Sequence, residues 1–89
     1  MIKTLLVANR GEIARRVIRT AKALGIRTVA VCSEADQTAP FTQDADVFEV
    51  IGTAAVADSY LQVDRILAVA KRHGVDAIHP RSEEHTSEL

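Results

Sequence analysis

The residues with the clearest chemical potential form a short polar turn between an apolar run and an amphipathic stretch. This turn is Ala8-Asn9-Arg10-Gly11-Glu12, and it stands where a dinucleotide-binding protein carries its glycine-rich loop. That loop needs three glycines, which let the backbone approach a pyrophosphate and let the helix pack close to the strand. Here there is one glycine, and the Glu12 carboxylate would repel a phosphate. Glu34 and Asp36 follow the next apolar run as in a Rossmann layout, yet the turn argues against NAD or FAD.

Few other side chains stand at spacings typical of a catalytic or metal site. The sequence contains no Gly-x-x-x-x-Gly-Lys-Ser/Thr loop, and its His, Cys, Asp and Glu residues do not have the spacing of metal ligands. His79 ends an apolar run at a position where a ligand could bind, although a lone histidine there is more often structural. Cys32 lies inside an apolar run without a neighbouring base, so we predict that it is inert.

The periodicity of the apolar residues indicates which elements must position that turn. Short apolar runs rich in β-branched side chains predict four strands: 3–8, 27–32, 47–51 and 75–79. Apolar residues at helical spacing predict two helices: 13–24 and 63–73. We expect Asn9 to cap the first helix, a Ser59-x-x-Gln62 capping box to begin the second, and Gly25 and Gly74 to end them. The polar segment 33–46 is expected to be a loop with at most one helical turn.

This alternation of strands and helices predicts an α/β fold with a Rossmann-like parallel sheet and helices on both faces. We expect the strand order 3-2-1-4, in which right-handed crossovers place the two helices on opposite faces. The carboxyl ends of the strands then meet at one edge, where open α/β sheets bind their ligands. Asn9, Arg10 and His79 are the candidate residues for the edge of a cleft there.

Bulk composition limits the classes of partner. The chain has 89 residues, a net charge of −1 and one cysteine, with two phenylalanines, one tyrosine and no tryptophan. Such a chain has no positive field for nucleic acid or anionic lipid and few rings on which bases could stack. No apolar run approaches the ~18 residues that a membrane span needs. We therefore expect a cytoplasmic domain that binds neither nucleic acid nor membrane.

The predicted first helix carries a basic face with two interpretations. Its members are Arg15, Arg16, Arg19 and Lys22. On one interpretation the face is solvated, and Glu12 and Arg16 form an i,i+4 ion pair. On the other, the face is a contact with a further subunit or domain.

Residues 81–89 do not continue the pattern of residues 1–80. They read Arg-Ser-Glu-Glu-His-Thr-Ser-Glu-Leu, and they look like the in-frame translation of a common sequencing adapter. The alternative is an ordinary polar linker or helix. We predict a non-native tail at 81–89 and exclude it from the fold, which makes 1–80 a partial domain.

Residues 5–14, LLVANRGEIA, closely resemble the opening of the biotin carboxylase family. Further matches keep their order and spacing: LGIRTVAV at 24–31, Ser33 with Asp36, Ala45-Asp46, Ile51-Gly52, Ser59-Tyr60-Leu61 and Asp76-Ala77-Ile78-His79-Pro80. The resemblance covers essentially all of residues 1–80. It is to the amino-terminal subdomain that precedes the ATP-grasp portion, as in acetyl- and propionyl-CoA carboxylases.

The resemblance implies an ATP-dependent ligase. In that family ATP and bicarbonate form carboxyphosphate, which carboxylates biotin, and Mg²⁺ or Mn²⁺ neutralises the triphosphate. The implied partners are the absent ATP-grasp region, a biotin carboxyl carrier domain and a second copy in a homodimer. Bacterial members use the first helix for dimer contact, so Arg16 and Arg19 become candidate interface residues. The family's catalytic, cofactor and metal residues lie downstream, so none is carried over, and no cofactor is expected on 1–80 alone.

Some positions depart from the family pattern. After Ile-His-Pro the family usually continues with a loop like Gly-Tyr-Gly-Phe-Leu-Ser-Glu-Asn, whereas Arg81 begins the polar tail here. Phe41 stands where the family often has a histidine, and Val47 replaces a glutamate. These departures leave the subfamily open, and with it the final acceptor: an acyl-CoA, pyruvate or urea.

We therefore expect an amino-terminal fragment of a biotin carboxylase that is inactive by itself. One alternative is a stand-alone Rossmann-type module that binds a nucleotide or regulates, and another is a purely structural domain. With one helix on each face, part of the sheet would stay uncovered. We expect residues 1–80 alone to be marginally stable or prone to association.

Overall fold

The computed structural model describes residues 2–52 and 63–79. Its elements in chain order are β1 (Thr4–Val7), α1 (Gly11–Ala23), β2 (Arg27–Ser33), the 3-10 helix η1 (Glu34–Asp36), α2 (Pro40–Asp44), β3 (Val47–Gly52), α3 (Val63–His73) and β4 (Ala77–His79). The predicted capping box at 59–62 and the predicted tail at 81–89 lie outside the described residues.

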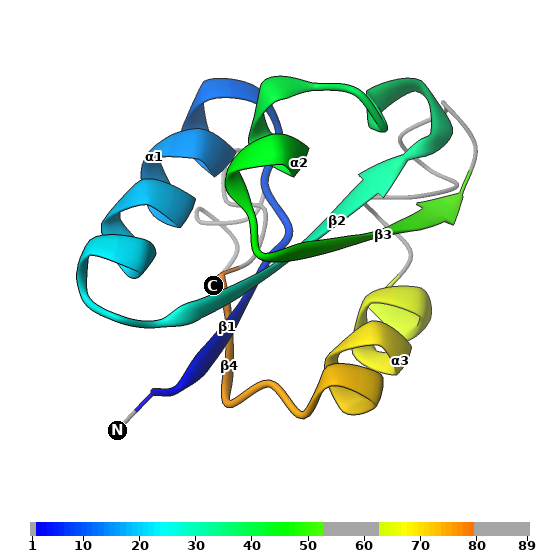
Figure 1. Ribbon diagram of the computed structural model, residues 1–89. Helices are drawn as coiled ribbons and strands as arrows, with labels where there is room; N and C mark the ends of the chain where they lie inside the picture. The colour runs from blue at the N-terminus through cyan, green and yellow to red at the C-terminus, as the bar shows by residue number, and fades with distance from the viewer. Residues whose placement is uncertain (1, 53–62, 80–89) are drawn as a thin grey trace, which may run out of the picture.

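The strands form one parallel sheet in the order β3-β2-β1-β4, which confirms the predicted fold class. The chain moves outward from β1 to β2 and β3, and then crosses back beyond β1 to β4 (Figure 1). Crossovers between parallel strands are right-handed as a rule, and with this strand order that rule places α1 and α3 on opposite faces. The point of reversal lies between β1 and β4, and the turn after β1 stands there.

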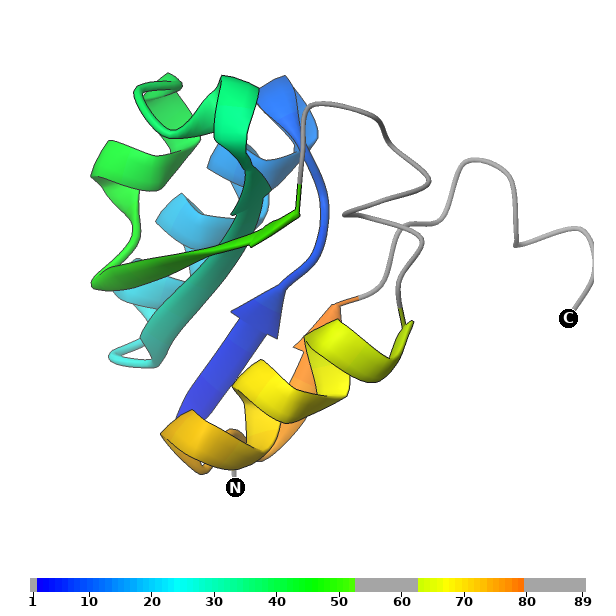
Figure 2. The same cartoon turned by 90° about the vertical axis from the view of Figure 1, so that its right-hand side faces the viewer.

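Helices cover both faces of the sheet. Figure 2 shows α1 and α2 on one side of the strands and α3 on the other. Successive side chains of a strand point to opposite faces, so Leu6 and Val7 belong to different cores. The core under α1 and α2 consists of Val7, Ala14, Ile18, Ala30, Cys32 and Phe41. The core under α3 consists of Leu6, Ala8, Val29, Val31, Ile51, Ile66 and Val69.

Both long helices end as the sequence predicts. Gly25 has φ +78°, and its N–H donates to Lys22 O at 3.0 Å while Ile26 N–H donates to Ala21 O at 2.9 Å. The same pair of bonds recurs after α3 around Gly74, which has φ +61°. These are Schellman motifs, in which a left-handed residue lets two backbone N–H groups reach the last free carbonyls of the helix.

The beginning of α1 differs from the prediction. Arg10, rather than Asn9, precedes the first helical residue, and its side chain makes no capping bond. Gly11 opens the helix with φ +58°, a conformation that other residues adopt at a cost. The prediction that Asn9 caps α1 is wrong because a residue from another strand, His79, holds its side chain.

The loop expected over 33–46 contains two helical segments, η1 and α2. Pro40 stands in the first turn of α2, where its missing N–H costs no hydrogen bond. Phe41 is buried against the core below α1, and this single large side chain fixes the segment. A single buried aromatic residue does not recur at helical spacing, so the pattern of apolar residues did not predict this helix.

The predicted apolar stripes are only partly buried. On α3, the buried core residues are Ile66 and Val69. Val63 and Leu67 are exposed, as are Ile13 and Leu24 on α1. Each helix therefore presents apolar side chains both to the sheet and away from it.

Candidate functional site

Parallel pairing of β1 with β4 brings the two ends of the described chain together. Val7 is in register with His79, and the N–H of Ala8 donates to the carbonyl of His79 at 3.0 Å. One residue further on, Asn9 Oδ1 lies 2.6 Å from His79 Nδ1. The contact joins residues 70 positions apart at the carboxyl edge of the sheet. Two of the three predicted cleft residues therefore meet.

The Asn9–His79 contact has a defined polarity. A carbonyl oxygen can only accept, so His79 Nδ1 donates the hydrogen bond to Asn9 Oδ1. The Asn9 side chain is fully buried. Its Nδ2 has no hydrogen-bond partner among the described residues, which is rare for a buried donor.

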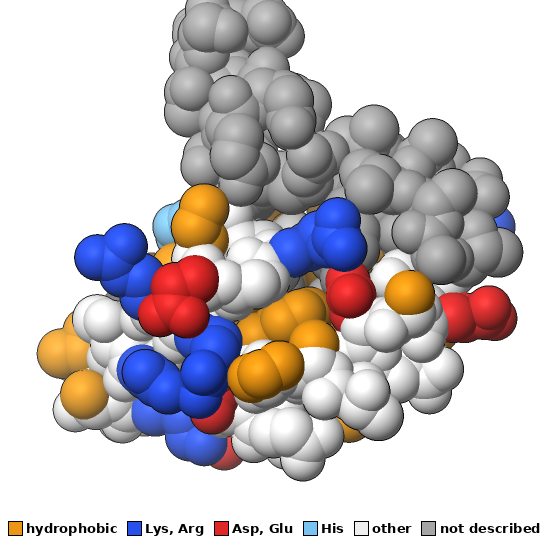
Figure 3. All heavy atoms as spheres, turned by 90° about the horizontal axis from the view of Figure 1, so that it is seen from above, with side chains coloured by type: hydrophobic (Ala, Val, Ile, Leu, Met, Phe, Trp, Pro, Cys, Tyr) orange, Lys and Arg blue, Asp and Glu red, His pale blue; other side chains and the backbone are white. Residues whose placement is uncertain are grey.

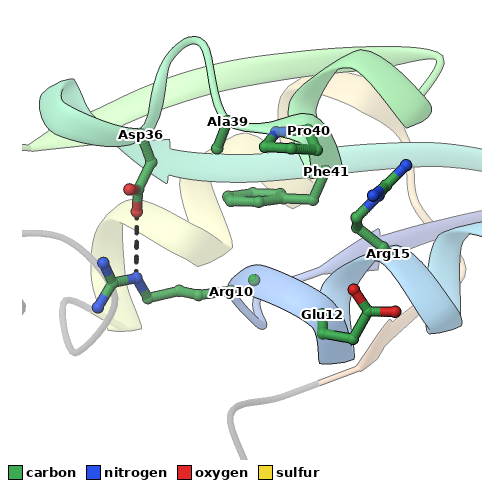
Figure 4. A pocket seen from close by; sticks show the side chains of 8 residues that line it. Arg10, Glu12, Arg15, Asp36, Ala39, Pro40 and Phe41 are labelled. Atoms are coloured by element: carbon green, nitrogen blue, oxygen red, sulfur yellow. Dashed lines mark hydrogen bonds and ion pairs between the residues drawn. The ribbon is translucent and has the colours of Figure 1, made fainter.

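Arg10, the third predicted cleft residue, turns to a different neighbour. Its Nε lies 3.1 Å from Asp36 Oδ2, so the ion pair joins the residue that precedes α1 to η1 at the end of β2. Figure 4 shows the two side chains pointing toward each other at one end of a pocket. The pair spans the gap between the ends of β1 and β2, where a Rossmann protein holds its nucleotide.

The pocket beside this pair has a volume of about 350 Å³. Arg10, Glu12 and Arg15 line its α1 side, while Ala39, Pro40 and Phe41 form the opposite wall (Figure 4). From above, hydrophobic side chains are seen flanked by basic and acidic ones (Figure 3). Each arginine already has a carboxylate partner, Asp36 or Asp44, so the pocket offers a phosphate no uncompensated cation.

The described residues do not fit a nucleotide or a metal ion. Within 2–52 and 63–79, no group of three or more His, Cys, Asp or Glu could hold a metal. The Arg10–Asp36 pair and the Glu12 side chain stand where phosphates would need space and positive charge. In the same ranges, no helix has the length and apolar character to cross a membrane. Burial raises the pKa of Cys32 to about 11, so its thiol is protonated at neutral pH.

The basic face of α1 is mostly engaged within the domain. Arg15 Nε lies 2.8 Å from Asp44 Oδ2, Arg19 Nε lies 3.9 Å from the same oxygen, and Lys22 donates to the Asp44 carbonyl. The hydrogen bond from Arg15 lowers the pKa of Asp44 below its usual range. The predicted Glu12–Arg16 ion pair is not among the ion pairs of the described residues.

Arg16 and Arg19, the two predicted interface residues, therefore have different surroundings. Arg19 leans toward α2, and its side chain stays 57% exposed. Arg16 lines an apolar groove of about 370 Å³ between α1 and the β4 edge, which His79 also lines. The other lining residues are Leu5, Val17, Thr20, Ala21, Leu24 and Ile26. The expectation of one helix on each face is wrong for this side of the sheet, where α2 packs beside α1.

Asp44 is the residue of this region that the sequence reasoning missed. It sits in α2, which was expected to be loop, and its partners are 22 to 29 positions away. The only available signal was the uneven basic face of α1, which calls for an acidic neighbour. Asp36, one of the two acidic residues that stand as in a Rossmann layout, forms an ion pair with Arg10.

Comparison with known proteins gives the site its family. A sequence model described as the N-terminal domain of biotin carboxylase matches residues 1–83. Biotin carboxylase of Halalkalibacterium halodurans is 59% identical, and biotin carboxylase 1 of Bacillus subtilis 60% identical, each over 80 residues. These alignments cover 90% of this chain and 18% of each relative.

A solved structure agrees with the sequence relatives. The biotin carboxylase domain of Hydrogenobacter thermophilus 2-oxoglutarate carboxylase superposes with a TM-score of 0.84 at 50% identity. The superposition covers 90% of this chain and 17% of that one, which was solved as a dimer with MgADP, ADP and bicarbonate. A stand-alone nucleotide module is not favoured by these relatives. The chain belongs to the biotin carboxylase family and corresponds to its amino-terminal domain.

Proposed function

We propose that the chain is the first subdomain of an ATP-dependent ligase that carboxylates biotin with bicarbonate. Its role is to supply the Rossmann-like scaffold on which the ATP-grasp region rests. The observation that carries the proposal is the match of 80 residues to biotin carboxylases, of which the chain spans about a fifth or less. The carboxylated biotin would then serve an acyl-CoA, pyruvate or urea.

The residues described here play no direct part in this chemistry. ATP, Mg²⁺ or Mn²⁺ and biotin are the groups that the whole enzyme uses, and they supply phosphoryl activation and the carboxyl carrier. The turn after β1 has an ion pair and a carboxylate where a phosphate would need room, which supports the proposal that this chain by itself does not bind ATP. The fragment is therefore inactive alone.

The groove between α1 and β4 supports a contact with the rest of the enzyme. Its apolar wall and Arg16 face outward at the edge of the sheet. Partners proposed from the family are the ATP-grasp region of the same chain, a second copy in a dimer, and a biotin carboxyl carrier domain. Arg16 and the exposed Arg19 would belong to the dimer contact. The enzyme would act in the cytoplasm.

Residues 81–89 belong to neither of these surfaces in this proposal, because we regard them as a translated adapter. Sequencing of the source DNA tests this directly. Adapter sequence from codon 81 is expected, and genomic sequence that continues unbroken through that codon contradicts it.

The function is tested in a chimera that joins residues 1–80 to the remainder of Bacillus subtilis biotin carboxylase 1. ATP- and bicarbonate-dependent carboxylation of free biotin is measured for the chimera, for the intact Bacillus enzyme and for the 89-residue chain. We expect activity from the first two and none from the third. A folded, soluble chimera without activity contradicts the proposal.

A further inference from the structure

The outer side of β3 is a strand edge that lacks common protection against pairing. β3 is the last strand on its side of the sheet, at the end opposite β4 (Figure 2). Within residues 2–52 and 63–79, no strand pairs with its outer side. Its sequence, Val-Phe-Glu-Val-Ile-Gly, contains neither the lysine nor the proline that often keeps such edges apart. The carbonyl of Ile51 already accepts from Arg65 at 2.7 Å, so we expect a further strand to pair mainly at residues 48–50.

The two faces of β3 carry different side chains at this edge. Phe48 and Val50 are in register with Ala30 and Cys32, so they point to the face that α1 and α2 cover. Both stay exposed, because α2 does not reach beyond them. Glu49 points to the opposite face, where α3 packs. The edge therefore offers two apolar side chains on one face and one carboxylate on the other.

This pattern is complementary to itself in one register. When two antiparallel strands pair around a twofold axis, directly opposite residues lie on the same face, so one residue meets its own copy. With the axis at Glu49, each Phe48 meets the Val50 of the second copy. An axis at Phe48 would instead place Val50 against Asp46, and an axis at Val50 would place Phe48 against Gly52. Of these three registers, the one centred on Glu49 matches apolar side chains with each other.

The same register places two Glu49 carboxylates opposite each other, which is unfavourable by itself. Arg72 offsets this repulsion. Its Nε and Nη2 donate to Glu49 at 3.1 and 2.7 Å, and its side chain is still 58% exposed. A guanidinium has five N–H groups, so Arg72 keeps donors for the second carboxylate. Two acids and two bases then surround the axis, and this charge complementarity identifies the occupant of the edge as a second copy of this chain.

We propose that two copies of this chain associate edge to edge through antiparallel β3 strands, around a twofold axis at Glu49. Phe48 of each copy packs on Val50 of the other, and each Arg72 is shared between the two Glu49 carboxylates. The two sheets become one continuous sheet. Because each copy contributes one short strand, the association is weak and depends on concentration. It uses the edge opposite β4, so it is separate from the groove between α1 and β4 and does not depend on the proposed function.

Sedimentation equilibrium of the 89-residue chain and its variants tests this proposal. Phe48→Lys removes the apolar pair, and Arg72→Gln leaves the Glu49 carboxylates uncompensated. Each change occurs twice in a symmetric dimer, so each should raise the dissociation constant about tenfold or more. Adding Glu49→Gln to Arg72→Gln removes the repulsion and should bring the dissociation constant back toward that of the parent. An Arg72→Gln chain that dimerises like the parent contradicts the proposed charge cluster.

Leu67→Lys and Lys71→Gln are the matched controls. They make the same kinds of change on the part of α3 that lines a groove beside Gly74 and Val75, which lead into β4 at the opposite edge. Each should leave the dissociation constant within about twofold, as surface changes outside a contact do. Circular dichroism shows whether every variant is folded. Equal losses in folded variants and controls, or species larger than a dimer, indicate non-specific association and overturn the proposal.

Nuclear magnetic resonance of the unmutated chain gives a readout that does not depend on how variants fold. In an equal mixture of isotope-labelled and unlabelled chains, contacts are expected between the Phe48 ring of one copy and the Val50 methyl groups of the other. Intermolecular contacts at other residues without this one overturn the proposal. So does a chain that stays monomeric at about 1 mM, since its association is then worth less than about 4 kcal/mol.

Discussion

Thr28 and Asp46 hold each other through three hydrogen bonds at the amino end of β2. Asp46 Oδ2 accepts from the Thr28 N–H at 2.7 Å and from the Thr28 hydroxyl at 2.9 Å. The same hydroxyl accepts from the Asp46 N–H at 3.0 Å. Thr28 is buried, so the carboxylate satisfies backbone and side-chain groups that would otherwise face apolar neighbours. These three hydrogen bonds fix where the chain enters β3 relative to β2.

Asp46→Asn should destabilise the chain by about 1 kcal/mol, because charged acceptors form stronger bonds and solvent screens part of that gain. The backbone bond from Thr28 holds the pKa of Asp46 below its usual range. A carboxylate with a depressed pKa stabilises the fold fully above its unfolded pKa. That contribution is lost as pH falls from about 5 through the folded pKa.

Urea unfolding in a stabilising osmolyte at several pH values measures this effect. The difference in unfolding free energy between the parent and Asp46→Asn should be largest near neutral pH and should disappear at acid pH. Asp64→Asn, an exposed carboxylate on α3, is the control and should change little. A gap that stays constant with pH would show that charge is not the cause.

Gly25→Ala should destabilise the chain by about 1 kcal/mol through backbone strain alone. An added Cβ would meet nothing within 4 Å, so no steric clash contributes. Gly25→Asn should cost less, because asparagine tolerates a positive φ better than alanine. Thermal melts of the three proteins rank these costs. Equal melting temperatures for the Ala variant and the parent would refute the argument.

Glu49→Gln should loosen the packing of α3 on the edge strand β3. Glu49 accepts from Arg72 Nε at 3.1 Å and Arg72 Nη2 at 2.7 Å, and it also contacts His73 Nε2 at 2.5 Å. The hydrogen bond from Arg72 holds the pKa of Glu49 below its usual range. We expect a loss of about 1 kcal/mol.

Hydrogen exchange shows which helix loses stability in Glu49→Gln. Amides of α3 should exchange faster in Glu49→Gln, while those of α1 keep their protection, because α1 packs on the opposite face. Uniform acceleration in both helices would indicate global rather than local destabilisation.

The 89-residue chain should associate through its exposed apolar side chains. Phe48 and Val50 are 38% and 40% exposed on β3, and Leu67 is 49% exposed on α3. Phe48→Lys with Leu67→Lys is expected to reduce association in sedimentation experiments while the circular dichroism spectrum is kept. A parent chain that stays monomeric at high concentration contradicts this prediction.

Much of the fold could be predicted because it rests on local signals. The apolar runs marked the strands, Gly25 and Gly74 ended the helices, and the alternation of strands and helices indicated a doubly wound sheet. Helix α2, in the second half of segment 33–46, was not predicted. It is held by the single buried ring of Phe41 and by the ion pair of Arg15 with Asp44. Such contacts leave no period in the sequence.

The sequence by itself determined the family and the strand order, since motifs and short-range patterns can be recognised without knowing which distant residues come into contact. The tertiary structure decided what the polar turn does. Parallel pairing of β1 with β4 brings His79 to Asn9, and η1 brings Asp36 to Arg10. These partners are 70 and 26 residues apart, so only folding turns the predicted helix cap into a buried amide whose Nδ2 has no partner among residues 2–52 and 63–79.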